Sequence, residues 1–284
     1  MTDSLNRLRF AVAATRHGGG GIRLATRVRR SGLDGFSEVL EGLSQAQVDA
    51  VDEDVERLAA QNVSALLLGD ADYPAVLAAS RAAPPVLFVR GPYKLLSESG
   101  IGMCGSRRAA DTSLHAAHAC SETIAARHLS LVSGYARGVD MVTHVGALAH
   151  GGTTVIVLPE GIERFRVRRG EFADVWDSSR VVVVSQFSPN QPWNAGAAMA
   201  RNAVISGLSQ ALVVVEAADT GGTLAAGLHA LERGQPVIVL QFDQEPAGNR
   251  ILLDKGAVPV RSRQELAERL ADLPAAGSDQ LSLI

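Results

Sequence analysis

Residues 129–158 read LSLVSGYARGVDMVTHVGALAHGGTTVIVL. An apolar run of strand length is followed by a loop of Gly, Ser and Arg, then by a segment with helical spacing, and then by a second apolar run. This succession is typical of a βαβ unit, in which a helix connects two parallel strands. Because the apolar residues of each run are continuous and do not alternate with polar ones, we expect both strands to be buried on both faces.

The same alternation continues on both sides of this stretch. Short apolar runs end in Gly, Ser or Glu, and helical segments follow most of them. The predicted strands are Ile101–Cys104, Leu129–Val132, Thr153–Leu158, Val181–Val184, Ala211–Val215 and Pro236–Leu240, with a short one at Val258–Val260. The sequence therefore predicts an α/β fold with a Rossmann-like, doubly wound and mostly parallel sheet.

The chain is expected to have three parts. Residues 1–61 show helix-like apolar spacing and predict a small helical N-terminal region, residues 62–274 a Rossmann-like domain, and residues 275–284 a flexible tail. Two further strands are expected at Val63–Leu68 and Val86–Gly91. Because Pro84-Pro85 precedes the second of them, and proline cannot donate within a central ladder, we predict an edge strand there.

The charge balance limits how this chain can bind an anion. Its 284 residues carry a net charge of −3 and are 46% hydrophobic. A protein that coats nucleic acid through overall basicity is excluded, so any anion site is local. Only Lys94 and Lys255 of the 27 basic residues are lysines, and the guanidinium group of arginine suits bidentate hydrogen bonding to phosphate. A GC-rich genome would give the same arginine-rich composition.

The cellular setting is predicted from absences in the sequence. Cys104 and Cys120 lack metal-ligand spacing and are typical of a reducing compartment. We find neither a signal-peptide pattern nor an apolar run of about 18 residues. The sequence therefore predicts a cytoplasmic protein without membrane association.

Small residues and arginines follow the first two strands of the regular region. Gly105-Ser106-Arg107 comes after the first strand, and Ser133-Gly134 with Arg137 comes after the second. In a doubly wound sheet, ligands bind beyond the carboxyl ends of the strands. Glycine and serine allow backbone N–H groups to approach an anion, and helix N-termini add partial positive charge. The two loops together predict a phosphate site, although glycine after a strand also serves simply to make a turn.

The segment 133–140 belongs to a longer pattern. Ser133-Gly134-Tyr135-Ala136-Arg137-Gly138-Val139-Asp140, followed by His144, Ala147-Leu148 and Gly151-Gly152, resembles the signature of the DNA-processing protein A (DprA/Smf) family. The resemblance extends, in order, from about Ala65 to Val260. It includes Arg201-Asn202, Ile205-Ser206-Gly207-Leu208, Val213 to Ala217, Gly221-Gly222-Thr223-Leu224 and Gly248-Asn249.

The resemblance implies a function and a set of site residues. Proteins of this family bind single-stranded DNA without sequence preference, dimerise, and help to load a RecA-type recombinase during natural transformation. The implied protein is not an enzyme and needs no cofactor. By position, phosphate contacts are implied for Gly105, Ser106, Arg107, Ser133, Gly134 and Arg137, while Arg201 and Asn202 line the opposite side and Gly221, Gly222 and Thr223 form the floor.

The chain departs from the family pattern at several places, among them Ser185-Gln186 in place of an acidic pair. Ala203 stands where the family has the second arginine of an Arg-Asn-Arg motif, which removes one basic contact. The turn after the third strand, Pro159-Glu160-Gly161 with Phe165-Arg166, replaces a Gly-x-Gly followed by Tyr-Pro. These departures leave open whether the role is in transformation, repair, phage defence or nucleotide sensing.

Two other function classes share the predicted fold. A nucleotide-sensing regulator would use the same loops, although Gly102 to Arg107 lacks the Gly-x-Gly-x-x-Gly spacing of dinucleotide sites. A phosphoribohydrolase of the lysine-decarboxylase-like (LOG) class would need Pro-Gly-Gly-x-Gly-Thr and a glutamate one turn later. Here Asp219 to Leu224 lacks the proline, and Glu232 comes too late.

Several side chains admit two interpretations. Asp140 and His144 share a helix face and suit acid–base work, but a structural role beneath the loop is favoured. Glu216 ends a strand, where it can accept from a ligand or anchor the Gly221-Gly222 turn. For His115 and His118, three apart on a helix, no third ligand is evident and no metal is expected.

The remaining candidates lie beyond the third predicted strand. Phe165 and Trp193 offer rings on which bases can stack, or they pack in the protein. The run of four arginines that begins at Arg164 and includes Arg166, Arg168 and Arg169 can track phosphates. The same arginines can instead pair with Glu160, Glu163 and Glu171 in a solvated loop.

Overall fold

A computed structural model describes residues 3–19 and 21–273 of the chain. The tail predicted at 275–284 lies outside the described residues. The chain divides into two compact units. The first contains the described residues up to Lys94 together with Leu158–Arg166 and Val182–Val204, and the second contains Leu95–Val157, Val167–Val181 and the described residues from Ile205 onward.

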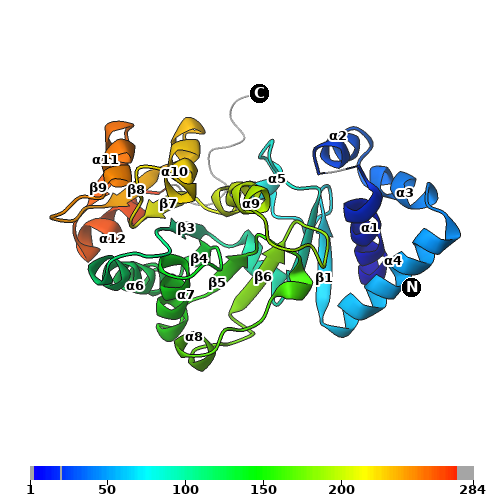
Figure 1. Ribbon diagram of the computed structural model, residues 1–284, viewed down its shortest axis with the longest axis horizontal. Helices are drawn as coiled ribbons and strands as arrows, with labels where there is room; N and C mark the ends of the chain where they lie inside the picture. Colours follow the sequence, from blue (N-terminus) through cyan, green and yellow to red (C-terminus); the bar gives the residue numbers. More distant parts are fainter. Residues whose placement is uncertain (1–2, 20, 274–284) are drawn as a thin grey trace. The chain divides into compact units, whose positions relative to one another are not determined.

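The first unit begins with four helices, which confirms the expected helical N-terminal region (Figure 1). They are α1 (Asp3–His17), α2 (Gly21–Ser31), α3 (Asp34–Glu41) and α4 (Gln45–Ala60). α1 contacts both α3 and α4 and buries a stripe of small and aliphatic residues that includes Leu8 and Val12. α4 begins at a capping box, in which the backbone N–H of Ser44 donates to the Gln47 side chain at 2.9 Å. The division of the chain after residue 61 stays a prediction.

The strands of the first unit run antiparallel. They are β1 (Val63–Leu67), β2 (Val86–Arg90) and β6 (Val181–Ser185), and the short helix α5 (Ala75–Ala78) lies between the first two in the chain. In register, Phe88 pairs with Ala65 on one side and with Ser185 on the other. The prediction of an edge strand at β2 was therefore wrong. Its prolines precede the ladder, and Pro85 takes part only through its carbonyl, which accepts from the Leu68 N–H at 2.9 Å.

The second unit contains six parallel strands, which confirms the mostly parallel sheet. They are β3 (Gly100–Cys104), β4 (Ser130–Ser133), β5 (Thr154–Val157), β7 (Ala211–Val214), β8 (Val237–Leu240) and β9 (Val258–Val260). Their order across the sheet is β5-β4-β3-β7-β8-β9, and the pairs β3–β4, β4–β5, β3–β7, β7–β8 and β8–β9 are all parallel. Each strand lies within two residues of its predicted position.

Helices cover both faces of these strands (Figure 1). One face carries α6 (Asp111–Ala126), α7 (Val139–Ala149) and α12 (Arg263–Ala271), and the other carries α10 (Gly222–Glu232) and α11 (Ala247–Asp254). β7 shows why its apolar run is continuous. Ala211 and Val213 belong to the core beneath α6, whereas Leu212 and Val214 belong to the core beneath α10.

The strand order places a topological switch point between β3 and β7. The chain starts at β3, moves outward to β4 and β5, and later returns to β7 on the other side of β3. The loops that follow β3 and β7 therefore lead to opposite faces of the sheet and diverge. In open α/β sheets, ligands bind in the crevice that this divergence creates.

The remaining elements are short or connect the larger ones. They are the 3₁₀ turns η1 (Tyr93–Ser97) and η2 (Ile162–Arg164), and the helices α8 (Glu171–Asp174) and α9 (Ala195–Gly207). Cys104 and Cys120 are free thiols, and burial raises the pKa of the Cys120 thiol to about 12. Among residues 3–19 and 21–273, no helix is long and apolar enough to cross a membrane.

Candidate functional site

Three loops of the second unit follow the carboxyl ends of β3, β4 and β7. We call them the β3 loop (105–110), the β4 loop (134–138) and the β7 loop (215–221). They contain most of the site residues that the sequence predicts. Because β3 is hydrogen-bonded to both β4 and β7, the three loops start side by side at one edge of the sheet.

The β3 and β4 loops touch each other through glycines. Gly138 has a φ of +77°, and a Cβ atom on it would lie 2.5 Å from the carbonyl oxygen of Ser106. A Cβ on Gly105 would lie 2.5 Å from the Val139 side chain. The backbone N–H of Val139 donates to the Ser106 carbonyl at 3.3 Å. These glycines are needed because the two loops pack backbone against backbone.

A buried histidine fixes the start of the β4 loop. The His144 side chain is fully buried, with Nε2 at 2.6 Å from the Gly134 carbonyl oxygen and Nδ1 at 2.7 Å from the Thr154 hydroxyl. Because a carbonyl can only accept, Nε2 carries a proton, and the Thr154 hydroxyl beside Nδ1 also reaches the Leu131 carbonyl at 3.2 Å. One helical turn earlier, Asp140 accepts from the Ala136 N–H at 3.3 Å. The structure thus gives Asp140 and His144 the structural roles favoured from the sequence.

Ser133 faces the interior of the sheet. Its hydroxyl donates to the Met103 carbonyl at 2.7 Å, and its exposed fraction is 0%. The carbonyl of the neighbouring Gly134 accepts from His144, and Gly134 is also buried. These two residues therefore connect the end of β4 to β3 and α7, and the Ser133 side chain does not point to solvent.

Tyr135 is held by a single arginine that is distant in sequence. The Arg168 guanidinium lies 4.3 Å from the centre of the Tyr135 ring and donates to the Tyr135 carbonyl at 2.6 Å. The Arg168 backbone N–H donates to the Tyr135 hydroxyl at 3.0 Å. Behind the ring, Phe172 packs edge to face at 5.6 Å. Burial raises the pKa of Tyr135, and the contacts with Arg168 oppose that rise.

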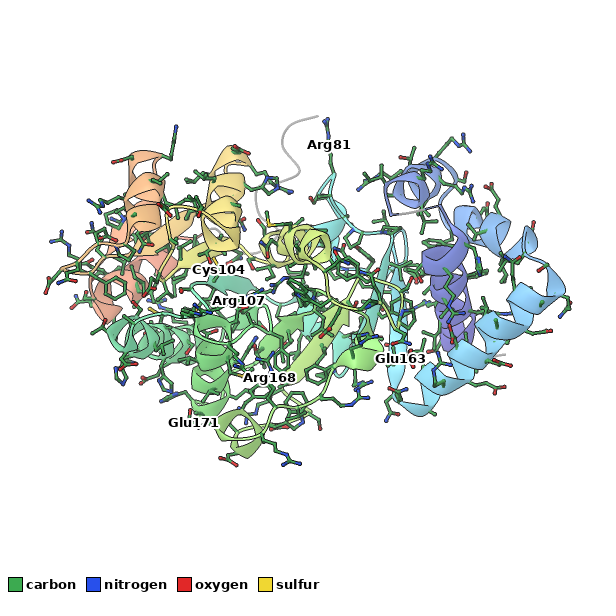
Figure 2. All side chains as sticks on the ribbon, in the orientation of Figure 1. Arg81, Cys104, Arg107, Glu163, Arg168 and Glu171 are labelled. Atoms are coloured by element: carbon green, nitrogen blue, oxygen red, sulfur yellow. The ribbon has the colours of Figure 1, made fainter. Side chains whose placement is uncertain are left out.

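The outer parts of the loops carry the exposed charge. Arg107 of the β3 loop and Arg137 of the β4 loop are exposed, and Ser106, where the two loops touch, is half-buried. Figure 2 labels Arg107 beyond the end of β3. Since Gly138 contacts the backbone of Arg107, the structure brings the predicted residues of the β3 and β4 loops together. Backbone contact and exposed guanidinium groups are thus combined at one place.

The β7 loop is held at its start and exposed further on. The buried Asn249 accepts from the Ala217 N–H at 2.8 Å and donates to the carbonyls of Val215 and Leu240 at 3.0 Å each. Gly221, with a φ of +104°, leads into α10, and both Gly221 and Gly222 are exposed, while Thr223 is half-buried. The sequence pattern included Asn249 but gave it no role, because its partners lie far away in the chain.

Glu216 connects the β7 loop to the β3 loop. Its carboxylate accepts from the backbone N–H of Ala110 at 3.1 Å, and Ala110 is the N-cap residue of α6. The residue is therefore an anchor, but it anchors the start of α6 and not the Gly221-Gly222 turn. A negative charge at this position also stabilises the helix N-terminus.

Arg201 and Asn202 lie in the part of α9 that belongs to the first unit. Arg201 is buried, with an exposed fraction of 7%, and Asn202 is half-buried. Their position across from the three loops stays a prediction. Of the two aromatic candidates in the same unit, Trp193 is 49% exposed, whereas Phe165 is 3% exposed and is therefore not available to stack on a base.

Arginines in and after η2 donate to backbone carbonyls. The Glu163 carboxylate binds Arg57 of the same unit at 2.7 Å, and Arg166 donates to the backbone carbonyls of Glu163 and Phe165. Glu163 thus has a partner in α4, and both expectations for the arginines, phosphate tracking and pairing within a solvated loop, stay predictions. His118 packs edge to face with His150 at 5.5 Å, and the described residues contain no group of three side chains suited to a metal ion.

The chain is similar to several known proteins. The family described as DNA recombination-mediator protein A matches residues 64–271. Protein Smf of Escherichia coli K12 is 34% identical over 205 residues, which cover 70% of this chain and 54% of Smf. DNA processing protein DprA of Bacillus subtilis 168 is 27% identical over 220 residues, which cover 75% of this chain and 73% of DprA. The chain thus spans about half the length of the first relative.

Solved structures agree on the fold. DprA from Streptococcus pneumoniae gives a TM-score of 0.75 at 23% identity, over 94% of this chain and 98% of that one. DprA from Helicobacter pylori, described for its single-stranded DNA binding mode, gives 0.64 at 23% identity, over 74% and 95%. These likenesses confirm the Rossmann-like fold. Since the family match covers well over half of its residues, the chain belongs to the DNA recombination-mediator protein A family.

Proposed function

We propose that this chain binds single-stranded DNA without sequence preference, at the β3, β4 and β7 loops of the second unit. The observation that carries the proposal is the convergence of these loops at the switch point, with Arg107 and Arg137 exposed on loops that touch through backbone. Family membership and the single-stranded DNA binding of the Helicobacter pylori relative support it.

The proposed contacts follow from the chemistry of the loops. Arg107 and Arg137 make charge-assisted bonds to phosphate oxygens, which carry no sequence information. The backbone of Gly105 and Ser106 approaches the phosphate chain closely. The exposed start of α10, at Gly221-Gly222-Thr223, adds N–H donors and a partial positive charge.

Other predicted residues support the site indirectly. Ser133 and Gly134 set the position of the β4 loop through Met103 and His144. We also propose that Arg201 and Asn202 line the DNA path, as the family resemblance implies. Binding of this kind needs no catalytic group, and the two side chains suited to acid–base work are engaged in holding the β4 loop.

The cellular role is proposed from family membership alone. We infer a cytoplasmic protein that dimerises and delivers single-stranded DNA to a RecA-type recombinase, in transformation, repair or phage defence. Co-purification of the recombinase with the chain on single-stranded DNA, compared with the recombinase alone, tests this part separately from DNA binding.

The DNA site is tested by fluorescence anisotropy. A labelled poly-dT strand of a few tens of nucleotides and its duplex are titrated with the wild type, with Arg107→Ala, and with Arg127→Ala as control. Arg127 is an exposed arginine between α6 and β4, at the opposite edge of the same strands. We expect salt-sensitive binding of the single strand, a loss of about tenfold or more in Arg107→Ala, and little change in the control.

Two results would overturn the proposal. If the wild type does not bind the strand at low salt, the DNA site does not exist. If Arg107→Ala and Arg127→Ala lose the same affinity, the loss reflects total charge and not the loops. Thermal stabilisation by nucleotides, without stabilisation by oligonucleotides, would replace DNA binding with nucleotide sensing.

A further inference from the structure

The helix α2 of the first unit is strongly basic. Its eleven residues, GIRLATRVRRS, include four arginines and no acidic residue. This composition stands out in a chain whose net charge is −3. The helix lies far in sequence from the three loops, and nothing in the proposed DNA site uses it.

Three of these arginines share one face of the helix. Arg23, Arg27 and Arg30 are four and three residues apart, so their side chains follow one another along a stripe about 10 Å long. Leu24 and Val28, also four apart, are the buried residues of the helix. The apolar face is thus already packed against the protein, and the stripe, which we call the α2 arginine stripe, faces outward.

The charge of the stripe is poorly neutralised. Arg27 is half-buried and lies 3.8 Å from the exposed Glu38. Arg23 and Arg30 are exposed, and no ion pair joins either of them to another described residue. Like charges three and four residues apart on a helix repel each other. Arg30 lies in the last turn, where a cation stabilises the helix, but Arg23 lies in the first turn, where it does not, so helix stability does not account for the whole stripe.

Further positive charge lies on another face of α2 and on the turn that this face contacts. Arg29 donates to the Ser80 carbonyl at 2.8 Å, which holds α2 against the turn that follows α5. Arg81 extends from this turn into solvent, as Figure 2 shows. Since Arg29 bonds to a neutral carbonyl, its charge is retained. The basic surface thus includes two segments that are about fifty residues apart in the chain.

We propose that the α2 arginine stripe is a second surface that contacts the phosphate backbone of DNA. Planar guanidinium groups spaced along a helix match a ligand with regularly repeated negative charges. A membrane surface is less suitable, because Leu24 and Val28 are buried and Ile22 is the one large apolar side chain that α2 exposes. This surface lies in the other unit from the proposed loops and does not depend on them.

The test compares two double variants of the full chain. Arg23→Gln/Arg30→Gln removes the ends of the stripe, and Arg127→Gln/Arg269→Gln removes two exposed arginines of the second unit as a matched control. Binding to single-stranded poly-dT and to duplex of the same length is measured over a range of salt. We expect the stripe variant to lose roughly five- to tenfold in affinity for the single strand, and its slope of log K against log salt to become shallower by about 1.4.

Stability separates a binding role from a folding role. The variant relieves like-charge repulsion but also removes the Arg30 cation from the last turn of α2, so its melting temperature should be close to that of the wild type. The variant Arg23→Lys/Arg30→Lys, which keeps both charges, should retain most of the salt slope. The proposal is overturned if the stripe variant binds DNA as tightly as the matched control does. It is also overturned if the stripe variant and the lysine variant are both partly unfolded and lose the same affinity.

The outcome is independent of the loop site. If Arg107→Ala binds normally while the stripe variant does not, the stripe is the DNA surface and the loop proposal fails. If the opposite holds, the loop proposal stands and the stripe is a solvated face. If the stripe variant loses affinity for the duplex alone, the stripe binds double-stranded DNA and does not contact the single strand.

Discussion

The β4 loop and the β7 loop begin at the same edge of the second unit, yet they are held in different ways. The β4 loop is fixed residue by residue: His144 bonds to Gly134, Arg168 covers Tyr135, and Asp140 accepts from Ala136. The β7 loop is held where it leaves the strand, through Asn249 and through the bond of Glu216 to Ala110. From 218 to 222 it is exposed.

This difference divides the work of binding between the two loops. A loop that is already ordered loses little conformational freedom when a ligand binds, so its contacts contribute fully to affinity. A loop that is exposed and held mainly at its start adapts its backbone to ligands of variable shape. For a flexible phosphate chain, we expect the β4 loop to set where the strand lies and the β7 loop to follow it.

The largest effect is expected from breaking the support of the β4 loop. His144→Ala leaves the buried Gly134 carbonyl without its side-chain donor, leaves the Thr154 hydroxyl with the Leu131 carbonyl alone, and opens a cavity, so we expect a loss of about 3 to 4 kcal/mol in the free energy of unfolding. Urea unfolding measures it. His150→Ala, at an exposed position with one backbone contact, should lose less than about 1 kcal/mol. Equal losses would show that the β4 loop does not depend on His144.

A smaller effect is expected from the backbone of the β7 loop. Gly221→Ala places a side chain at a φ of +104°, which should cost about 1 to 2 kcal/mol. Gly222→Ala, at the first residue of α10 with open space around it, should be neutral or slightly stabilising. Thermal unfolding of the two neighbours gives a direct comparison. A neutral Gly221→Ala would mean that the turn relaxes without strain.

The smallest effect at neutral pH is expected from Arg168→Gln, which keeps a polar side chain but shortens it and removes its charge. Loss of the cation over the Tyr135 ring should cost about 0.5 to 1 kcal/mol. Because the positive charge favours the phenolate, its removal raises the pKa of Tyr135 further above the unfolded value of 10.0. Arg169→Gln, at the next exposed position, should leave this pKa unchanged.

The sign of the pH dependence follows from that shift. A tyrosine whose pKa is raised in the folded state contributes full stability below its unfolded pKa and loses it as the pH rises through the folded pKa. Stability should therefore fall above about pH 10, and further in Arg168→Gln than in the wild type. Absorbance titration of the tyrosines, together with unfolding at pH 7 and at alkaline pH, tests both statements. An unchanged titration would show that Arg168 acts on Tyr135 through packing alone.

The sequence was most informative where local pattern and structure coincide. Continuous apolar runs predicted β3 to β9, because strands buried on both faces need apolar residues at every position. The β3 and β4 loops were predicted as neighbours for the same reason, since they follow adjacent parallel strands. Long-range contacts left no such pattern. Asn249 and Val215 are 34 residues apart, and Arg168 and Tyr135 are 33 apart.

Local rules also failed in a specific way. Proline before Val86 predicted an edge strand, but the rule concerns prolines inside a ladder, and both prolines lie ahead of it. Phe165 was a candidate for stacking, yet its place in the fold buries it. The exposure of a side chain depends on which elements pack against it, and the neighbouring residues in the sequence do not show this.

The bond between Glu216 and Ala110 bears on which ligands the crevice can accept. In dinucleotide-binding proteins of this fold, the pyrophosphate sits at the N-terminus of the helix that follows the first strand of the sheet, which here is α6. In this chain a carboxylate of the protein itself lies at that helix terminus, so the position already holds an internal anion. A nucleotide cofactor would have to displace the Glu216 carboxylate or bind against its negative charge. A polymer can instead place its phosphates along the arginines of the loops and leave Glu216 in place.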